Sequence, residues 1–115
     1  MKYLYLLYAD ESKMPAPGSA EFNAQNNAYN EYYGVLEGKG LFKSGDPVMP
    51  SKTSKTVRVR NAATKADSGP FAHGGDQVIG FYVVDAKDID EAVAYAAKCP
   101  AASVGAVEVR PIVQM

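Results

Sequence analysis

Two stretches of the chain carry apolar side chains on both faces of an extended strand. After the initial lysine, residues 2–8 are all Tyr or Leu, so both faces of a strand there carry apolar side chains. Residues 78–84 are apolar apart from one glycine. An uninterrupted apolar run of this length is typical of a strand that is covered on both sides. The pattern therefore predicts that these two segments form the centre of one sheet.

Helical spacing and capping residues predict two helices. Ser19 is a suitable N-cap for the first helix, which the glycines at 38 and 40 end. Asp88 opens the second helix with Glu91 three residues later, as in a capping box, and Pro100 ends it. The predicted inner faces are Phe22, Tyr29, Tyr32, Tyr33 and Leu36 in the first helix, and Ile89, Ala92, Val93 and Ala96 in the second.

Shorter patterns predict the remaining elements. Residues 41–44 are expected to form a short strand, and residues 45–47 a turn out of it. Residues 56–60 alternate as a strand, which a turn at 61–64 connects to a returning hairpin arm at 65–67. A glycine-containing loop is expected at 68–76, and the last strand at 104–112.

The predicted order is β-α-β, a β-hairpin, and β-α-β. It indicates an α+β, ferredoxin-like subunit with both helices on one sheet face, formed by residues 1–115 as a single domain. The central strands of that fold are here 2–8 and 78–84. Since two helices cover only one face of the sheet, a large apolar face would stay exposed. A second copy of the same sheet is the most economical cover, so the pattern predicts a homodimer.

Composition and charge narrow the class of protein. The 115 residues include 12 Lys and Arg against 13 Asp and Glu, a net charge of -1, which argues against a general binder of nucleic acid or anionic membranes. No segment approaches the ~18 apolar residues of a membrane-spanning helix. The one cysteine excludes an intramolecular disulfide. We therefore expect a cytoplasmic protein with neither nucleic-acid nor membrane partners.

The loop around His73 carries the best candidate for acid–base chemistry. A histidine changes charge near neutral pH, and carboxylates lie close to it in the sequence, so the predicted catalytic set is His73, Asp67 and Asp76. The alternative is a structural role at the rim of a pocket. His73 and Asp76 are too few ligands for a metal site. No phosphate-binding glycine motif occurs, so no nucleotide cofactor is expected either.

Charged side chains on two predicted strands are candidates for a ligand site. Glu108 and Arg110 share one face of the last strand, and Arg58 lies on the polar face of residues 56–60. An arginine can hold a carboxylate or phosphate group, and seven of the 12 basic residues lie within 39–65. We therefore expect a small anionic or polar ligand; the alternative is a solvated edge or an ion pair across the dimer contact. The predicted ligand-binding residues are Tyr8, Asp10, Arg58, Ser68, Phe71, Tyr82, Glu108 and Arg110.

Several short motifs resemble one family along nearly the whole chain. They are the strand end Tyr-Ala-Asp-Glu at 8–11, Val-Arg-Val-Arg at 57–60, the loop Asp-Ser-Gly-Pro-Phe at 67–71, and the closing Glu-Val-Arg-Pro at 108–111. Together they are similar to the DGPF-motif branch of the YCII-related domain family. The resemblance implies a dimeric α/β-barrel of ferredoxin-like subunits, with a pocket between the sheet and neighbouring loops.

The resemblance implies no single activity. Some relatives in the wider family are small-molecule enzymes that use a His–Asp pair, and some domains accompany sigma factors. This chain has Ser68 where the branch usually has Asp, and His73, Gly75 and Asp76 where Glu, Lys and Glu are usual. Two functions are therefore predicted as alternatives. One is an acid–base enzyme of the lyase or isomerase type with its pocket near the Ser68–Asp76 loop. The other is a non-catalytic ligand-sensing or protein-interaction module, for example one associated with transcription.

Overall fold

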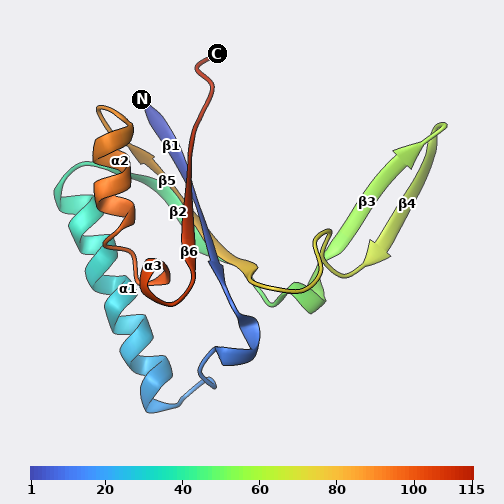
Figure 1. Cartoon of the computed structure of the whole chain (residues 1–115), viewed down its shortest axis with the longest axis horizontal. Coiled ribbons are helices and arrows are strands. Elements are labelled where there is room, and N and C mark those ends of the chain that lie inside the picture. The colour runs from blue at the N-terminus through green and yellow to red at the C-terminus, as the bar shows by residue number, and fades with distance from the viewer.

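The computed structural model describes residues 1–115 and has the predicted α+β architecture (Figure 1). An antiparallel sheet has the strand order β2–β5–β1–β6, which is the ferredoxin-like order, and a second sheet contains only β3 and β4. The strands are β1 (Lys2–Ala9), β2 (Phe42–Pro47), β3 (Lys55–Arg60), β4 (Ala63–Ser68), β5 (Gln77–Asp85) and β6 (Ala106–Pro111). The helices are α1 (Ala20–Gly38), α2 (Ile89–Ala96) and α3 (Ala101–Val104), with single 3-10 turns at Glu11–Lys13 and Ser51–Thr53.

The helices cover one face of the four-stranded sheet, as predicted (Figure 1). Tyr3, Tyr5 and Leu7 of β1 point to this side and are buried. The Tyr5 hydroxyl donates a hydrogen bond to the Ala92 carbonyl of α2, which ties the central strand to the helix above it. No helix of the chain combines the length and the apolar character that crossing a bilayer requires.

The opposite face of the sheet, which we call the open face, carries the alternate apolar set. Leu4 and Leu6 of β1 lie opposite Val83 and Phe81 of β5, and all four side chains are only partly buried. Because directly paired residues point to the same side of a sheet, they form one apolar strip. The structure thus confirms that the central strands are apolar on both faces.

The first helix begins and ends where predicted. The Ser19 hydroxyl accepts a hydrogen bond from the Phe22 N–H at 3.1 Å, and the chain leaves the helix through Gly40 at φ +71°, a conformation that glycine tolerates best. Tyr32 and Leu36 are buried. Tyr33 was also predicted for the inner face, but it is exposed, and its ring packs edge-on against Phe42.

The second helix is capped as predicted but buries a narrower face. The Asp88 carboxylate accepts a hydrogen bond from the Glu91 N–H at 2.8 Å. Ala92 and Ala96 are buried. Ile89 and Val93 are exposed, so their assignment to the inner face was wrong. The contact with the Tyr5 hydroxyl brings the alanine side of α2 close to the sheet, and the larger side chains are turned outward.

Two other predicted boundaries were wrong. Residues 45–47 continue β2 instead of turning, because they pair with residues 80–82 of β5. Gly45 fits this pairing because an added Cβ would lie 2.6 Å from the Tyr82 ring. Val104, predicted to start the last strand, instead ends α3, and the strand begins at Ala106.

The hairpin of β3 and β4, residues 55–68, projects from the rest of the chain, and we call it the arm (Figure 1). Its turn is shorter than predicted: Asn61 and Ala62 have φ +50° and +63°, and pairing resumes at Ala63. Positive φ at both central residues is typical of the tight hairpin turn that matches strand twist. The arm makes the molecule broad and thin, with extents of 47 × 43 × 19 Å.

Candidate functional site

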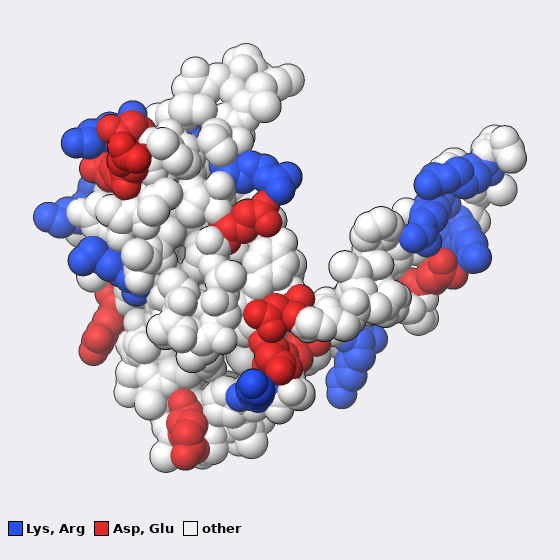
Figure 2. Space-filling model, viewed as in Figure 1, with Lys and Arg blue, Asp and Glu red and all other residues white.

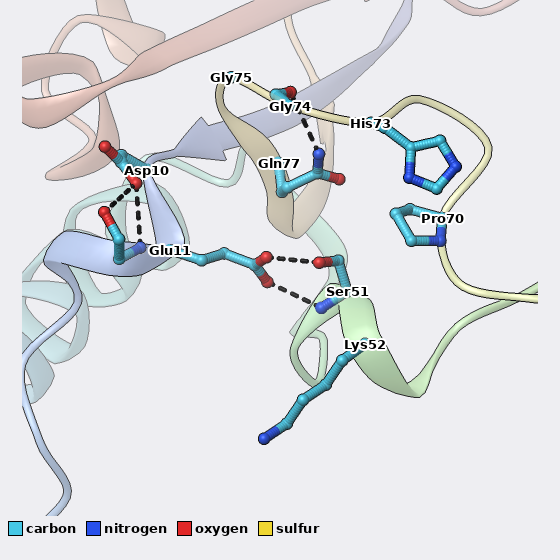
Figure 3. A pocket seen from close by; sticks show the side chains of 10 residues that line it. Asp10, Glu11, Ser51, Lys52, Pro70, His73, Gly74, Gly75 and Gln77 are labelled. Carbon is cyan, nitrogen blue, oxygen red and sulfur yellow. Dashed lines mark hydrogen bonds between the residues drawn. The ribbon is translucent and has the colours of Figure 1, made fainter.

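A polar pocket of about 400 Å³ lies where the arm joins the four-stranded sheet (Figure 3). Three segments far apart in the sequence form it: the end of β1 with its 3-10 turn, the entry to the arm, and the exit from the arm. None of its lining residues is hydrophobic. They are Asp10, Glu11, Ser12, Ser51, Lys52, Pro70, His73, Gly74, Gly75 and Gln77.

Glu11 connects the sheet to the entry of the arm. Its carboxylate accepts a hydrogen bond from the Ser51 N–H at 2.7 Å and another from the Ser51 hydroxyl (Figure 3). These bonds, chiefly the one from the hydroxyl, hold the pKa of Glu11 below its ordinary value. Because hydrogen bonds to a carboxylate favour its charged form, Glu11 is an anion at neutral pH.

Asp10 is the second carboxylate of the pocket, and it caps the 3-10 turn. It accepts hydrogen bonds from the hydroxyl and the N–H of Ser12, at 2.7 and 2.9 Å. The hydroxyl bond is the main reason that the pKa of Asp10 is lowered. Both carboxylates of the pocket therefore already have hydrogen-bond donors within the chain.

The exit from the arm forms the third wall. Gln77 donates from its side-chain amide to the Ala72 carbonyl at 3.0 Å and to the Gly74 carbonyl at 3.4 Å. Gly74 and Gly75 both have positive φ, +76° and +63°, which residues with a Cβ rarely adopt. The amide of Gln77 thus holds a turn whose shape depends on two consecutive glycines.

Comparison with known proteins shows a match along the entire chain. Residues 1–115 match the YCII-related domain. The chain belongs to the YCII-related domain family. This YCII-related chain is also 30% identical over 114 residues to an uncharacterised protein of Rhizobium meliloti (strain 1021), and the alignment covers 97% of this chain and 92% of that protein. The family that the sequence motifs resembled is thereby confirmed.

The structure of this YCII-related domain separates the three predicted catalytic residues. His73 lines the pocket, beside Pro70 and on the other side of Gln77 from Asp10 (Figure 3). None of the ion pairs in the chain includes His73. Asp67 lies on the arm, where it pairs with Arg58 at 3.5 Å and with Lys65 at 3.9 Å. Asp76 is exposed and is not among the residues that line the pocket.

Three predicted ligand-binding residues meet at the base of the arm, outside the pocket lining. The Arg58 guanidinium lies 5.2 Å from the centre of the Phe71 ring, a cation–π contact. Ser68 accepts a hydrogen bond from the Lys55 ammonium group at 2.7 Å. Asp10 is therefore the member of the predicted ligand-binding set that lines the pocket.

Three further members lie on the open face of the sheet. Glu108 and Arg110 of β6 form an ion pair with each other, opposite Leu6 and Leu4 of β1. Tyr8 follows on the same side, opposite Ala106, and is partly buried. The two charged residues predicted to share one face of the last strand therefore do so, and they border the apolar strip.

Tyr82 lies on the helix side of the sheet, away from these groups. It is paired with Tyr5 and its ring packs edge-on against Tyr32, with the centroids 5.5 Å apart. Burial raises the pKa of Tyr82 to about 12. Its surroundings are those of a core side chain.

Outside the predicted loop, sequence reasoning missed five of the residues that build the pocket: Glu11, Ser12, Ser51, Lys52 and Gln77. Glu11 and Ser51 are 40 residues apart, and no spacing rule relates them. No pattern in the sequence around Gln77 distinguished this residue from an ordinary first residue of a strand. The structure contains no cluster of three or more His, Cys, Asp or Glu side chains suited to a metal ion.

Proposed function

We propose that this protein is a homodimer that binds a small polar molecule carrying a carboxylate or phosphate group, in the pocket at the base of the arm. The observation that carries the proposal is the construction of the pocket: three separate segments meet there, no hydrophobic side chain lines it, and Glu11 spans it to Ser51. Polar groups that converge in a concave site can fix the orientation of a small ligand.

The hydrogen-bond donors of the pocket support an anionic group on the ligand. Asp10 and Glu11 accept their hydrogen bonds from Ser12 and Ser51. The side chains of Lys52 and His73, by contrast, donate to no group within the chain, so their N–H donors are left for a ligand. Charge-assisted hydrogen bonds from lysine and protonated histidine to carboxylate or phosphate are among the stronger ones.

The open face of the sheet supports the homodimer. An apolar strip runs along its two central strands and ends at the Glu108–Arg110 pair. Packing the open face against the same face of a second copy would remove this apolar surface from water, which is the main driving force of association.

Within the family, we place this chain in the DGPF-motif branch on the strength of residues 67–71, which shape the exit of the arm.

The buried free thiol of Cys99 supports a location in the reducing cytoplasm.

Proton transfer by His73 is a second candidate function. His73 lines the pocket, and histidine is the side chain that most often transfers protons in enzymes. The geometry supports binding better, because the carboxylates of the pocket are engaged by serines instead of orienting the imidazole. A ligand-sensing module that catalyses no reaction would need only the ligand pocket and the dimer interface.

A thermal-shift screen of small carboxylates, phosphates and ammonium compounds tests the proposal. We expect one or more anions to raise the Tm of the wild type and of a Lys98→Ala control, whose lysine lies outside the pocket, but not that of Lys52→Ala. Equal stabilisation of all three proteins, or of none by any anion, would contradict it. Turnover then separates the two uses: a compound that the wild type converts and His73→Gln only binds supports proton transfer, and a compound that the wild type binds without turnover supports sensing.

A further inference from the structure

The arm has one apolar side that nothing in the chain covers. Val57 is paired with Ala66 and Val59 with Thr64, so these four side chains share one face. Val57 and Val59 are 60% and 56% exposed. A two-stranded hairpin alone is at best marginally stable in water, because it lacks a core. The arm therefore requires a surface to pack against.

Each root of the arm also carries an exposed apolar side chain. Met49, before the entry, is 73% exposed, and Phe71, after the exit, is 74% exposed. Phe71 packs on the guanidinium of Arg58, which lies on the other side of the hairpin from the two valines. Four exposed apolar side chains on one projecting segment are nonetheless more than the isolated ones that any surface carries, and they mark a contact with another molecule.

The arm and the remainder of the chain have net charges of opposite sign. Residues 55–68 contain four basic residues and one acidic residue, which leaves eight basic and twelve acidic residues elsewhere, so the arm is +3 and the remainder -4. Figure 2 shows Lys and Arg gathered on the arm and acidic side chains where it meets the sheet. A second copy of this chain offers the arm a partner surface of opposite net charge.

The base of the arm is held so that it points outward. Gly69 N–H donates to the Ser54 carbonyl at 2.8 Å, and the Thr56 hydroxyl donates to the Gly69 carbonyl at 2.9 Å. Glu11 binds the entry segment through Ser51. These contacts direct the arm away from its own sheet (Figure 1), and the second copy is then the surface within its reach.

We infer that the arm is an intersubunit clasp: its Val57–Val59 side packs on the second copy, and the second copy's arm does the same in return. The inference rests on the proposed homodimer. It adds that docking of the arm steadies the pocket, because Ser51, Lys52 and Pro70 of the pocket lining belong to the roots of the arm. Docking the arm fixes two of the three walls, so ligand binding and dimer formation strengthen each other by the same factor.

Site-specific photocrosslinking tests the clasp. The natural thiol, Cys99, is buried and its pKa is raised to about 11, so a benzophenone maleimide will label an introduced cysteine selectively. Val59→Cys places the probe on the apolar side, and Arg60→Cys, the matched control, places it on the other side one residue away. Mixing ¹⁵N-labelled and unlabelled chains identifies crosslinks between subunits by mass spectrometry.

We expect mixed-isotope crosslinks from Val59→Cys at a yield several-fold above that of Arg60→Cys. Crosslinks within one chain only, or equal yields from both positions, would overturn the inference. Sedimentation velocity of the unlabelled wild type separates the two levels of the proposal. A dimer without the Val59→Cys crosslinks refutes the clasp alone, and a monomer at tens of micromolar refutes the homodimer and the clasp together.

A second experiment makes the apolar side of the arm more polar and measures the dimer dissociation constant. Val57→Thr with Val59→Thr keeps two β-branched side chains in the hairpin but adds hydroxyls to its apolar side. We expect the dimer dissociation constant to rise by at least about tenfold, since four valines lose their contacts across a two-fold interface. Arg60→Thr, on the other side, should change it by less than about threefold. Equal effects would overturn the inference.

Discussion

The Glu11 carboxylate accepts two hydrogen bonds from Ser51, one from its N–H and one from its hydroxyl, across 40 residues of sequence. This contact joins the end of the first strand to the entry of the arm and spans the pocket. The Glu11–Ser51 contact therefore links the sheet to the arm and also forms part of the candidate ligand site.

Glu11→Gln should lower the stability of the protein at neutral pH, and the loss should disappear in acid. The folded-state pKa of Glu11 is lowered by its bonds to Ser51, so its contribution is present above the unfolded-state pKa and is lost as the pH falls through the folded one. Urea melts of wild type and variant between pH 7 and pH 3 measure this. A difference that grows toward acid would contradict the assignment.

Tyr5→Phe should cost about 1–2 kcal/mol, because it removes the donor to the Ala92 carbonyl inside the core. Tyr33→Phe is the matched control, since Tyr33 is exposed, and should change the free energy of unfolding by less than about 0.5 kcal/mol. Denaturant titrations of the three proteins give the values. Similar losses in both variants would show that the hydroxyl bond contributes little.

Gly105→Ala should be strongly destabilising, by more than about 2 kcal/mol. An added Cβ would lie 1.9 Å from the Tyr8 carbonyl oxygen, which is backbone and cannot rotate away. Gly34→Ala, inside α1 with no atom within 4 Å of the new Cβ, should instead stabilise by up to about 1 kcal/mol. Thermal melts of both variants check the opposite signs, and the same sign in both would refute the packing argument.

Cys99 should not react with thiol reagents in the folded protein. Burial raises the pKa of its thiol to about 11, and only the thiolate is nucleophilic. At pH 8 we expect reaction with an aromatic disulfide to be at least about a hundredfold slower in buffer than in guanidinium chloride. Labelling at comparable rates in both conditions would show that the thiol is accessible.

Local rules accounted for most of the helices and strands. The caps at Ser19 and Asp88 formed as their residue types predict, because a cap depends on atoms within three positions of it. The same rules failed at 45–47, where pairing with β5 overrode a turn-like Gly-Asp-Pro sequence. They also failed at Ile89 and Val93, whose exposure depends on how closely α2 approaches β1.

The sequence by itself determined the α+β order, the two central strands and the apolar strip on the open face, since alternation along a strand assigns each side chain to a face before any partner is known. Only the tertiary structure decided that Asp10, Ser51 and His73 line one pocket and that Asp67 does not. A pocket forms from segments that the path of the chain brings together, and the direction of the arm set which residues those are.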